Sequence, residues 1–255
     1  MVVVNRSGEG GTLKILFYDI ETTPISAYTW GLWEQNVSLK QIVTPTELLC
    51  FGAQWLDGER VIFRSQHHHG KQRMLETVHG LIDRADVVVG WNSANFDRKH
   101  LNREFLEAGM TPPSPTRELD LMKVVKANFR FPSNKLDYVA QALDVGGKVN
   151  HTGFDLWLGC MAGDEAAWSL MKRYQVQDVK LLIDLYEKLK PWMKWHPDKN
   201  IVDGGDDGCS VCGGKLHRAG NYYTNTGVFD QFRCSVCGKY HRAVKRRRSS
   251  SVRPV

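Results

Sequence analysis

The sequence predicts an α/β fold followed by a small metal-binding module. Short β-rich runs alternate with amphipathic helical patterns over most of the chain, which is typical of α/β proteins. The first run, residues 13–20 (LKILFYDI), is mostly apolar, as expected for a strand in the middle of a sheet that is covered on both faces. Two Cys-x2-Cys pairs near the C-terminus indicate the module. We therefore expect a central sheet flanked by helices, with the small module after it.

The expected elements follow one another in the order strand, hairpin, helix, strand, helix. Residues 48–56 and 60–64 are rich in β-formers, and the Asp57-Gly58 pair between them is a hairpin turn signal. Residues 86–90 (DVVVG) predict another buried strand. Apolar residues at helical spacing predict helices over residues 71–84, 96–108, 134–143 and 164–189. Residues 119–129 fit either a strand or a helix.

The 255 residues suffice for one sizeable domain and a small module. We expect a flexible N-terminus (1–12), a large α/β domain (13–195), a Gly/Asp linker (196–208), the cysteine module (209–243) and a disordered basic tail (244–255). The net charge of +6 is concentrated at the C-terminal end, because Pro191 to Val255 holds 12 Lys/Arg and 5 Asp/Glu. A polyanionic partner such as nucleic acid would be attracted there first.

The composition is that of a soluble globular protein, with 42% hydrophobic and 24% charged residues. No apolar run is long enough to span a bilayer, which argues against a membrane partner. The N-terminus lacks the features of a signal peptide, so we expect a cytoplasmic location. Cys50 and Cys160 stand in apolar contexts and are interpreted as buried packing residues.

Asp19 and Glu21 are the first candidate site residues. They end the first predicted strand, and residues two apart on a strand project to the same face, with Ile20 pointing to the opposite layer. Two adjacent carboxylates repel each other unless a cation lies between them. Hard oxygen ligands suit Mg²⁺ or Mn²⁺. Taken alone, this pattern is more often a solvated turn.

Two more candidates lie further along the chain. Asp97 follows the 86–90 strand at a loop-to-helix junction, where α/β sheets place their sites, although an acid also simply favours a first helical turn. Tyr174 and Asp178 are four residues apart in the predicted helix 164–189 and so share one face. The alternative for this pair is an ordinary amphipathic helix with a surface acid.

Together these residues resemble the motifs of one family. Residues 17–22 (FYDIET) resemble the first motif of the DEDD, or DnaQ-like, 3′–5′ exonuclease superfamily. Asn92-x3-Phe96-Asp97 resembles the second motif, and Tyr174-x3-Asp178 the third. The resemblance spans roughly residues 13–190. Arg173 stands where the His form of the third motif would have its histidine, so the chain is similar to the Tyr form (DEDDy), including stand-alone exonucleases often encoded by phages.

The resemblance implies an RNase H-like mixed sheet and hydrolysis of phosphodiester bonds assisted by two Mg²⁺ or Mn²⁺ ions. It implies that Asp19 bridges both metals, that Glu21 and Asp178 complete the first site, and that Asp97 serves the second. Tyr174 would orient the attacking water, since its ordinary pKa of about 10 makes it a poor base. Other acids could in principle replace a member of this set, namely Asp120, Asp144, Asp155 and Asp184.

Several aromatic residues are candidates for holding the substrate. Tyr28, Trp30 and Trp33 follow the first motif and could stack on terminal nucleotides, or could pack against the domain as a lid. Asn92 and Phe96 of the second motif are further candidates. Residues 67–69 are three consecutive histidines, which cannot all face one ion on a regular element, so we interpret them as a solvated loop.

The cysteine pairs predict a zinc ribbon. Cys209, Cys212, Cys234 and Cys237 supply four thiolates, which close a tetrahedral structural Zn²⁺ site. His217 and His241 are not needed as ligands. The aromatic residues between the pairs suit a small hairpin. The ribbon and its basic tail could hold a phosphate backbone or dock another replication protein.

The leading interpretation is an exonuclease that removes nucleoside 5′-monophosphates from the 3′ end of single-stranded DNA, in the cytoplasm of a bacterial host if the chain is phage-encoded. An exoribonuclease with the same site is the first alternative, because the choice between DNA and RNA depends on contacts to the 2′-OH that the sequence does not reveal. A nucleic-acid-binding adaptor with a degenerate site is the second alternative, and the intact acids and Tyr174 argue against it.

Overall fold

The computed structural model describes residues 13–203 and 207–252. They belong to two compact units, one of which is Lys14–Glu187, while the other includes the residues from Lys188 onward. The expected flexible segment 1–12 lies outside the described residues. Among the helices that are described, none combines the length and the apolar character needed to cross a bilayer.

The first unit is built on a five-stranded mixed sheet in the order β5-β4-β1-β6-β7. Its strands are β1 (Ile15–Thr22), β4 (Leu48–Trp55), β5 (Ile62–Ser65), β6 (Val87–Gly90) and β7 (Arg117–Asp120). β1 pairs antiparallel with β4 and parallel with β6, so it is the middle strand, as its apolar sequence predicts. A short ribbon of β2 (Ser26–Ala27) and β3 (Ile42–Thr44) lies outside this sheet, with a 3₁₀ turn at Leu39–Gln41.

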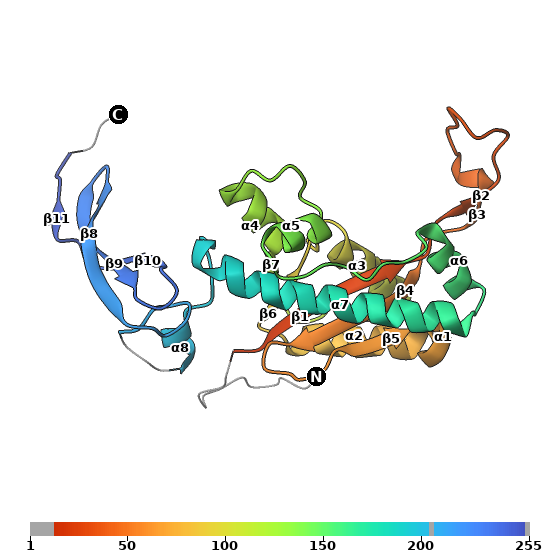
Figure 1. Ribbon diagram of the computed structural model, residues 1–255, viewed down its shortest axis with the longest axis horizontal. Helices are drawn as coiled ribbons and strands as arrows, with labels where there is room; N and C mark the ends of the chain where they lie inside the picture. Colours follow the sequence, from red (N-terminus) through yellow and green to blue (C-terminus); the bar gives the residue numbers. More distant parts are fainter. Residues whose placement is uncertain (1–12, 204–206, 253–255) are drawn as a thin grey trace. The chain divides into compact units, whose positions relative to one another are not determined.

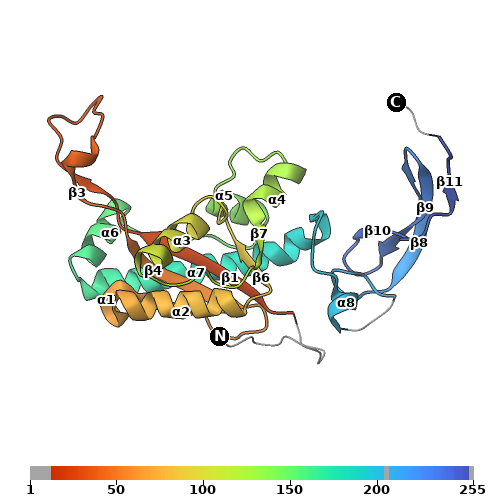
Figure 2. The same ribbon diagram turned by 180° about the vertical axis from the view of Figure 1, so that it is seen from behind.

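Helices cover both faces of the sheet. They are α1 (Gln66–His69), α2 (Lys71–Arg84), α3 (Asp97–Glu107), α4 (Leu121–Asn128), α5 (Leu136–Ala142), α6 (Phe154–Met161) and α7 (Glu165–Leu189). The two views in Figures 1 and 2 show α2 and α7 on opposite faces. The predicted α/β architecture, a mixed sheet flanked by helices, is confirmed.

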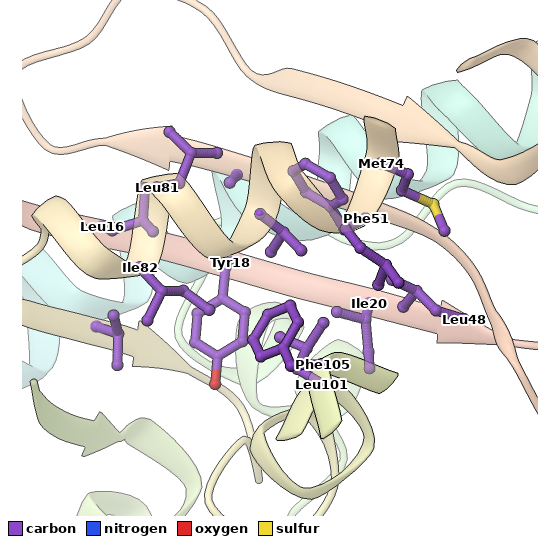
Figure 3. Packing of buried hydrophobic residues seen from close by; sticks show 14 of the residues in the cluster. Leu16, Tyr18, Ile20, Leu48, Phe51, Met74, Leu81, Ile82, Leu101 and Phe105 are labelled. Atoms are coloured by element: carbon purple, nitrogen blue, oxygen red, sulfur yellow. The ribbon is translucent and has the colours of Figure 1, made fainter. Parts of the chain in front are cut away.

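The core between the sheet and α2 holds the apolar residues of β1 that point to that side. Leu16, Tyr18 and Ile20 pack there with side chains of α2 and α3 (Figure 3). The α2 side chains in this cluster recur at helical spacing: Met74, Leu75, Val78, Leu81 and Ile82. This amphipathic spacing explains why the sequence predicts α2 with its observed bounds.

The opposite face of the sheet packs on α7. Phe17 of β1 meets Tyr186 of α7 edge to face, with ring centroids 5.3 Å apart. Trp168 and Met171 of α7 join Leu49 and Cys50 of β4 in a second core cluster. Alternation along β1 therefore divides its side chains between two layers. Cys50 and Cys160 are free and buried, as expected from their apolar contexts.

Residues 119–129, for which the sequence allows either state, contain both a strand and a helix. β7 ends at Asp120, whose carboxylate then caps α4 by accepting hydrogen bonds from the Met122 and Lys123 amides. The short helices α1 and α6 are absent from the sequence-based expectation. At four and eight residues, they are too short for a helical period to be distinctive.

The second unit contains an antiparallel sheet formed by β8 (Leu216–Thr224), β9 (Gly227–Cys234), β10 (Tyr240–Arg242) and β11 (Arg248–Ser249). β8 and β9 form the hairpin expected between the two cysteine pairs. The expected linker 196–208 contains α8 (Lys199–Asp203), after a 3₁₀ turn at Lys190–Trp192. The basic tail, expected to be disordered from residue 244, instead contributes β11, because Arg248 and Ser249 pair with β9.

Candidate active site

Asp19 and Glu21 lie toward the carboxyl end of β1, on the face of the sheet that α7 covers. Gln175 of α7 donates a hydrogen bond from Nε2 to Asp19 Oδ2 at 3.0 Å. The side chain of Trp157 on α6 lies close enough to Glu21 to lower the pKa of this carboxyl, against the larger effect of burial. Ile20 points into the α2 layer instead. The two acids thus share a face, as the period of two along a strand predicts.

Gly52 lets α7 approach this face closely. Gly52 of β4 pairs directly with Asp19 in the sheet. A Cβ atom at position 52 would lie 2.9 Å from Gln175 Oε1 and 3.1 Å from a methyl carbon of Val179. Only glycine leaves room for this packing. The glycine therefore positions the helix segment that carries Tyr174 and Asp178.

Asp97 reaches the same region from the start of α3. Its Oδ1 accepts a hydrogen bond from the backbone N–H of Ile20 at 3.1 Å, and the side chain is buried. Asn92, in the loop before α3, has a φ of 61°, a conformation that asparagine tolerates better than most residues. The Asn92 N–H donates to Asp120 Oδ1 at 3.0 Å, which fixes the loop that ends at Asp97.

Tyr174 and Asp178 lie on one face of α7, and both are buried. The amine of Lys148 contacts both residues, donating to the Tyr174 hydroxyl at 2.7 Å and forming an ion pair with Asp178. Sequence reasoning missed Lys148. The residue follows two glycines in an irregular segment after α5, where no periodicity or motif marks its side chain.

The four acids affect one another's charge. Burial raises the pKa of Asp19 well above its ordinary value, and repulsion from Asp97, Asp178 and Glu21 adds to the shift. Burial also raises the pKa of Glu21 to about 8 and that of Asp97 to about 7. The pKa of Asp178 is raised by burial too, against the opposing charge of Lys148. The cluster therefore favours a cation or protons over four free carboxylates.

Lys148 and Tyr174 keep their protons in this setting. Burial lowers the pKa of Lys148, but Asp178 and Tyr174 outweigh that effect and leave it above the ordinary value. Burial is the main cause that raises the pKa of the Tyr174 hydroxyl above its ordinary value. Lys148 thus supplies a positive charge beside Asp178.

The donor set fits divalent cations of the Mg²⁺ and Mn²⁺ type. It consists of carboxylate oxygens, which hard cations prefer. Asp178 Oδ1 is buried and makes no hydrogen bond, so one ligand atom is free of a protein partner. In the described part of the chain, two clusters of three or more possible metal ligands have all their ligand atoms within 4.8 Å of one another. Neither of these clusters includes the four acids of the candidate site. No three of the four acids therefore have ligand atoms within 4.8 Å of one another, and a bound cation would have to draw them together.

The other acids that could join the site are placed differently. Asp120 is buried, but its Oδ1 caps α4 and accepts the Asn92 N–H. Asp144, Asp155 and Asp184 are exposed. Asp184 lies on the outer side of α7, six residues after Asp178.

The aromatic candidates for substrate contact are exposed. Tyr28, Trp30 and Trp33 expose 77%, 98% and 83% of their surface, so they are not packed as a lid. They belong to the segment between β2 and β3. Phe96 is 40% exposed beside Asp97, with its ring centroid 4.5 Å from that of His100.

The four ribbon cysteines gather at one point in the second unit. Cys209 Sγ lies 3.6 Å from Cys237 Sγ, and Cys212 Sγ lies 3.5 Å from Cys234 Sγ. A Zn²⁺ ion with Zn–S bonds of about 2.3 Å would separate the sulfur atoms by about 3.8 Å, so the cluster fits zinc. His241 Nε2 lies 3.2 Å from Cys209 Sγ. At this distance His241 can form a hydrogen bond with the Cys209 sulfur. The four cysteines remain the expected zinc ligands.

A sequence model described as RNase_H superfamily matches residues 16–190. The chain belongs to the RNase_H superfamily. Apart from Ile15, the matched range includes all five strands of the sheet, and it contains the four acids and the tyrosine of the candidate site. Membership confirms the expected fold and indicates a nuclease type of domain.

Proteins named as DNA polymerases are similar to this RNase_H superfamily chain. A protein of Frog virus 3 (isolate Goorha) that is named as a DNA polymerase, 060R, is 26% identical over 141 residues, which cover 42% of this chain and 14% of the viral protein. The family B DNA polymerase of the archaeon Pyrobaculum calidifontis has a similar fold, with a TM-score of 0.54 at 20% identity over 73% of this chain and 26% of the polymerase. The chain therefore spans only a small part of these relatives.

Proposed function

We propose that this chain is a divalent-metal-dependent 3′–5′ exonuclease that releases nucleoside 5′-monophosphates from single-stranded DNA. The observation that carries the proposal is that Asp19, Glu21, Asp97 and Asp178, from three separate elements, lie close enough for their negative charges to repel one another. The similarity to proteins named as DNA polymerases supports DNA as the substrate. Membership of the RNase_H superfamily supports phosphodiester hydrolysis.

The four acids would hold two Mg²⁺ or Mn²⁺ ions. Asp19, whose charge interacts with those of the other three acids, would contact both ions, Glu21 and Asp178 would help to hold one, and Asp97 the other. Bound there, the cations would supply Lewis-acid activation of water and offset charge on the phosphate and the leaving 3′ oxygen. Gln175 fixes the orientation of Asp19 through its hydrogen bond.

Tyr174 would orient the attacking water. Its oxygen accepts a hydrogen bond from Lys148, and its own hydrogen would be donated to a water or a phosphate oxygen once substrate is bound. Because its pKa is raised, the hydroxyl stays protonated at neutral pH and does not act as a base. The amine of Lys148 adds a positive charge where the negative scissile phosphate would lie.

The exposed aromatic residues would hold the 3′ end of the strand. Base stacking on Tyr28, Trp30 or Trp33 contributes about 1–3 kcal/mol per base. Asn92 and Phe96, which precede Asp97 in the same loop, could contact the terminal nucleotide. The ribbon would bind phosphates through basic residues such as Arg218, Arg233 and Arg248, and docking of a replication protein there stays a prediction.

End-labelled strands test the proposal. The full chain is incubated with 5′-labelled single-stranded DNA or RNA in Mg²⁺, Mn²⁺ or EDTA. We expect a ladder of shortening DNA products in Mg²⁺ or Mn²⁺ and none in EDTA. Asp178→Asn should reduce cleavage at least about 100-fold, whereas Asp184→Asn on the same helix should leave it unchanged.

The alternatives predict other outcomes. A ladder with RNA alone would identify the chain as an exoribonuclease. Release of the labelled 5′ nucleotide as the first product would reverse the direction of cleavage. Binding of either strand without cleavage would favour an adaptor with a degenerate site. Each of these results would contradict the proposed function.

A further inference from the structure

A second group of metal-binding side chains lies on the first unit, outside the carboxylate cluster. His67 and His68 are on α1, and Glu165 is the first residue of α7. His67 Nε2 lies 3.1 Å from Glu165 Oε1, and His68 Nε2 lies 3.2 Å from Glu165 Oε2. The three ligand atoms all lie within 4.8 Å of one another. Residues almost a hundred positions apart in the sequence therefore converge at this point.

This arrangement corrects the interpretation of residues 67–69 as a solvated loop. The segment is a helical turn, in which the first two rings face Glu165. The third ring turns away, and His69 Nδ1 accepts a hydrogen bond from the Ser65 N–H at 3.3 Å. Three consecutive histidines indeed do not share one ion, but two of them can.

The two imidazole rings are held in place by buried neighbours. The indole of Trp168 stacks on His67, with centroids 5.5 Å apart and planes inclined by 12°, and it meets His68 edge to face at 5.6 Å. Ser65 Oγ lies 3.0 Å from His68 Nδ1. A proton on Nδ1, donated to Ser65 Oγ, would leave the lone pair of His68 Nε2 for an ion bound between this ring and Glu165. Such outer contacts commonly orient the histidine ligands of metals.

We propose that His67, His68 and Glu165 bind a divalent transition-metal ion of the zinc type. Imidazole nitrogen suits zinc, nickel and copper, whereas carboxylate-only sites suit magnesium. Bonds of about 2.0–2.1 Å in a tetrahedral zinc site separate the ligand atoms by about 3.3 Å, close to the spacing between each imidazole and Glu165. Three protein ligands leave one position for water. The side chains of His67 and His68 are about one-third exposed, so an ion can enter from solvent.

The site is separate from the carboxylate cluster. Glu165 precedes Tyr174 by nine residues on α7, which is about 14 Å along a helix. The donor sets also differ, with two nitrogens and one carboxylate here and carboxylates alone there. A bound ion would join α1 to the start of α7 and stabilise the fold at this end of the helix.

Zinc titration of the full chain tests the proposal. The ribbon is first loaded with zinc, and excess Mg²⁺ is kept present to occupy the carboxylate cluster, so that further Zn²⁺ reports the new site by calorimetry and by native mass spectrometry. We expect the wild type to bind one additional Zn²⁺ per chain, with a rise in melting temperature. Glu165→Gln and His67→Asn should each weaken this binding at least about tenfold, by analogy with changes around other metal sites.

His69→Asn is the matched control, because it changes the neighbouring histidine and keeps an acceptor for the Ser65 N–H. It should bind the additional ion as tightly as the wild type. Absence of an additional ion in the wild type would overturn the proposal. Loss of binding in His69→Asn equal to that in Glu165→Gln would also overturn it, because the histidines would then act as an unstructured run.

Discussion

Lys148 forms an ion pair with Asp178 in the middle of the candidate active site, and the same amine donates to the Tyr174 hydroxyl at 2.7 Å. A lysine in this position has two consequences. It offsets part of the repulsion among the four acids, lowering the pKa of Glu21 and Asp178 against the effect of burial. It also holds a carboxylate that a divalent cation would use, so the amine and the cation interact with the same ligand.

Replacing Lys148 by methionine should shift the pH dependence of cleavage. Without the positive charge, the pKa values of Glu21 and Asp178 rise, so protons compete with metal up to a higher pH. We expect the midpoint of the rising limb of the pH–rate profile to move upward by about one unit or more. Lys180→Met, which removes an exposed lysine of α7, the helix that carries Asp178, serves as the control. An unchanged midpoint in Lys148→Met would show that Lys148 does not act on these acids.

Alanine at Gly52 should disturb the site from the sheet side. The added methyl group would meet Gln175 Oε1 at 2.9 Å, which forces α7 or Gln175 to move away from Asp19. Overpacking of this kind costs about 1–3 kcal/mol in the free energy of unfolding. Urea unfolding measures this loss, and cleavage should fall with it. Gly80→Ala on α2 is the control, because its added Cβ atom would lie no closer than 3.8 Å to another atom. The helix propensity of alanine should instead stabilise this variant by up to about 1 kcal/mol.

Without Mg²⁺ and Mn²⁺, the first unit should lose stability as the pH rises. Glu21 has a pKa of about 8 in the folded protein and an ordinary value of 4.5. Between these values the folded state binds a proton that the unfolded state does not, so the free energy of unfolding decreases as the pH increases. Thermal unfolding should show this decrease from about pH 5 to 8, and Glu21→Gln should reduce it. Added Mn²⁺ should restore stability most strongly at the high end. A melting temperature of the metal-free wild type that rises from pH 5 to 8 would contradict the raised pKa of Glu21.

Removal of the ribbon metal should separate binding from cleavage. Serine at Cys209 and Cys212 removes two of the four zinc ligands, and the ribbon should lose its fold because zinc binding supplies folding free energy to such modules. We expect one zinc fewer per chain and weaker binding of long strands, with cleavage of short strands preserved. Equal loss of cleavage on short and long strands would instead make the ribbon part of the catalytic unit. The zinc content is measured by elemental analysis, alongside the Cys50→Ser variant as a control outside the ribbon.

Local patterns were sufficient for the parts of the site that lie on regular elements. The period of two along β1 places Asp19 and Glu21 together, and the helical period places Tyr174 beside Asp178. The same reasoning predicts α2 from its buried apolar residues. These features depend only on neighbours in the sequence.

Other features depend on contacts between distant segments, which local patterns do not contain. Lys148 lies in an irregular segment, and only the packing of that segment on α7 brings its amine to Asp178. The cluster of His67, His68 and Glu165 needs α1 and α7 to meet, and the turn that separates His69 from its neighbours is only four residues long. β11 forms in a basic tail because β9 offers it an edge, which composition alone does not reveal.

The most direct test of the proposed metal-dependent site is a crystal structure of the full chain with a short DNA strand and Mn²⁺, with the ions located by anomalous scattering. We expect two Mn²⁺ ions about 3.5–4 Å apart, contacted by Asp19, Glu21, Asp97 and Asp178, with the Lys148 amine displaced from Asp178. Absence of Mn²⁺ from this cluster, or Asp97 and Asp178 remaining out of reach of ions held by Asp19, would contradict the account.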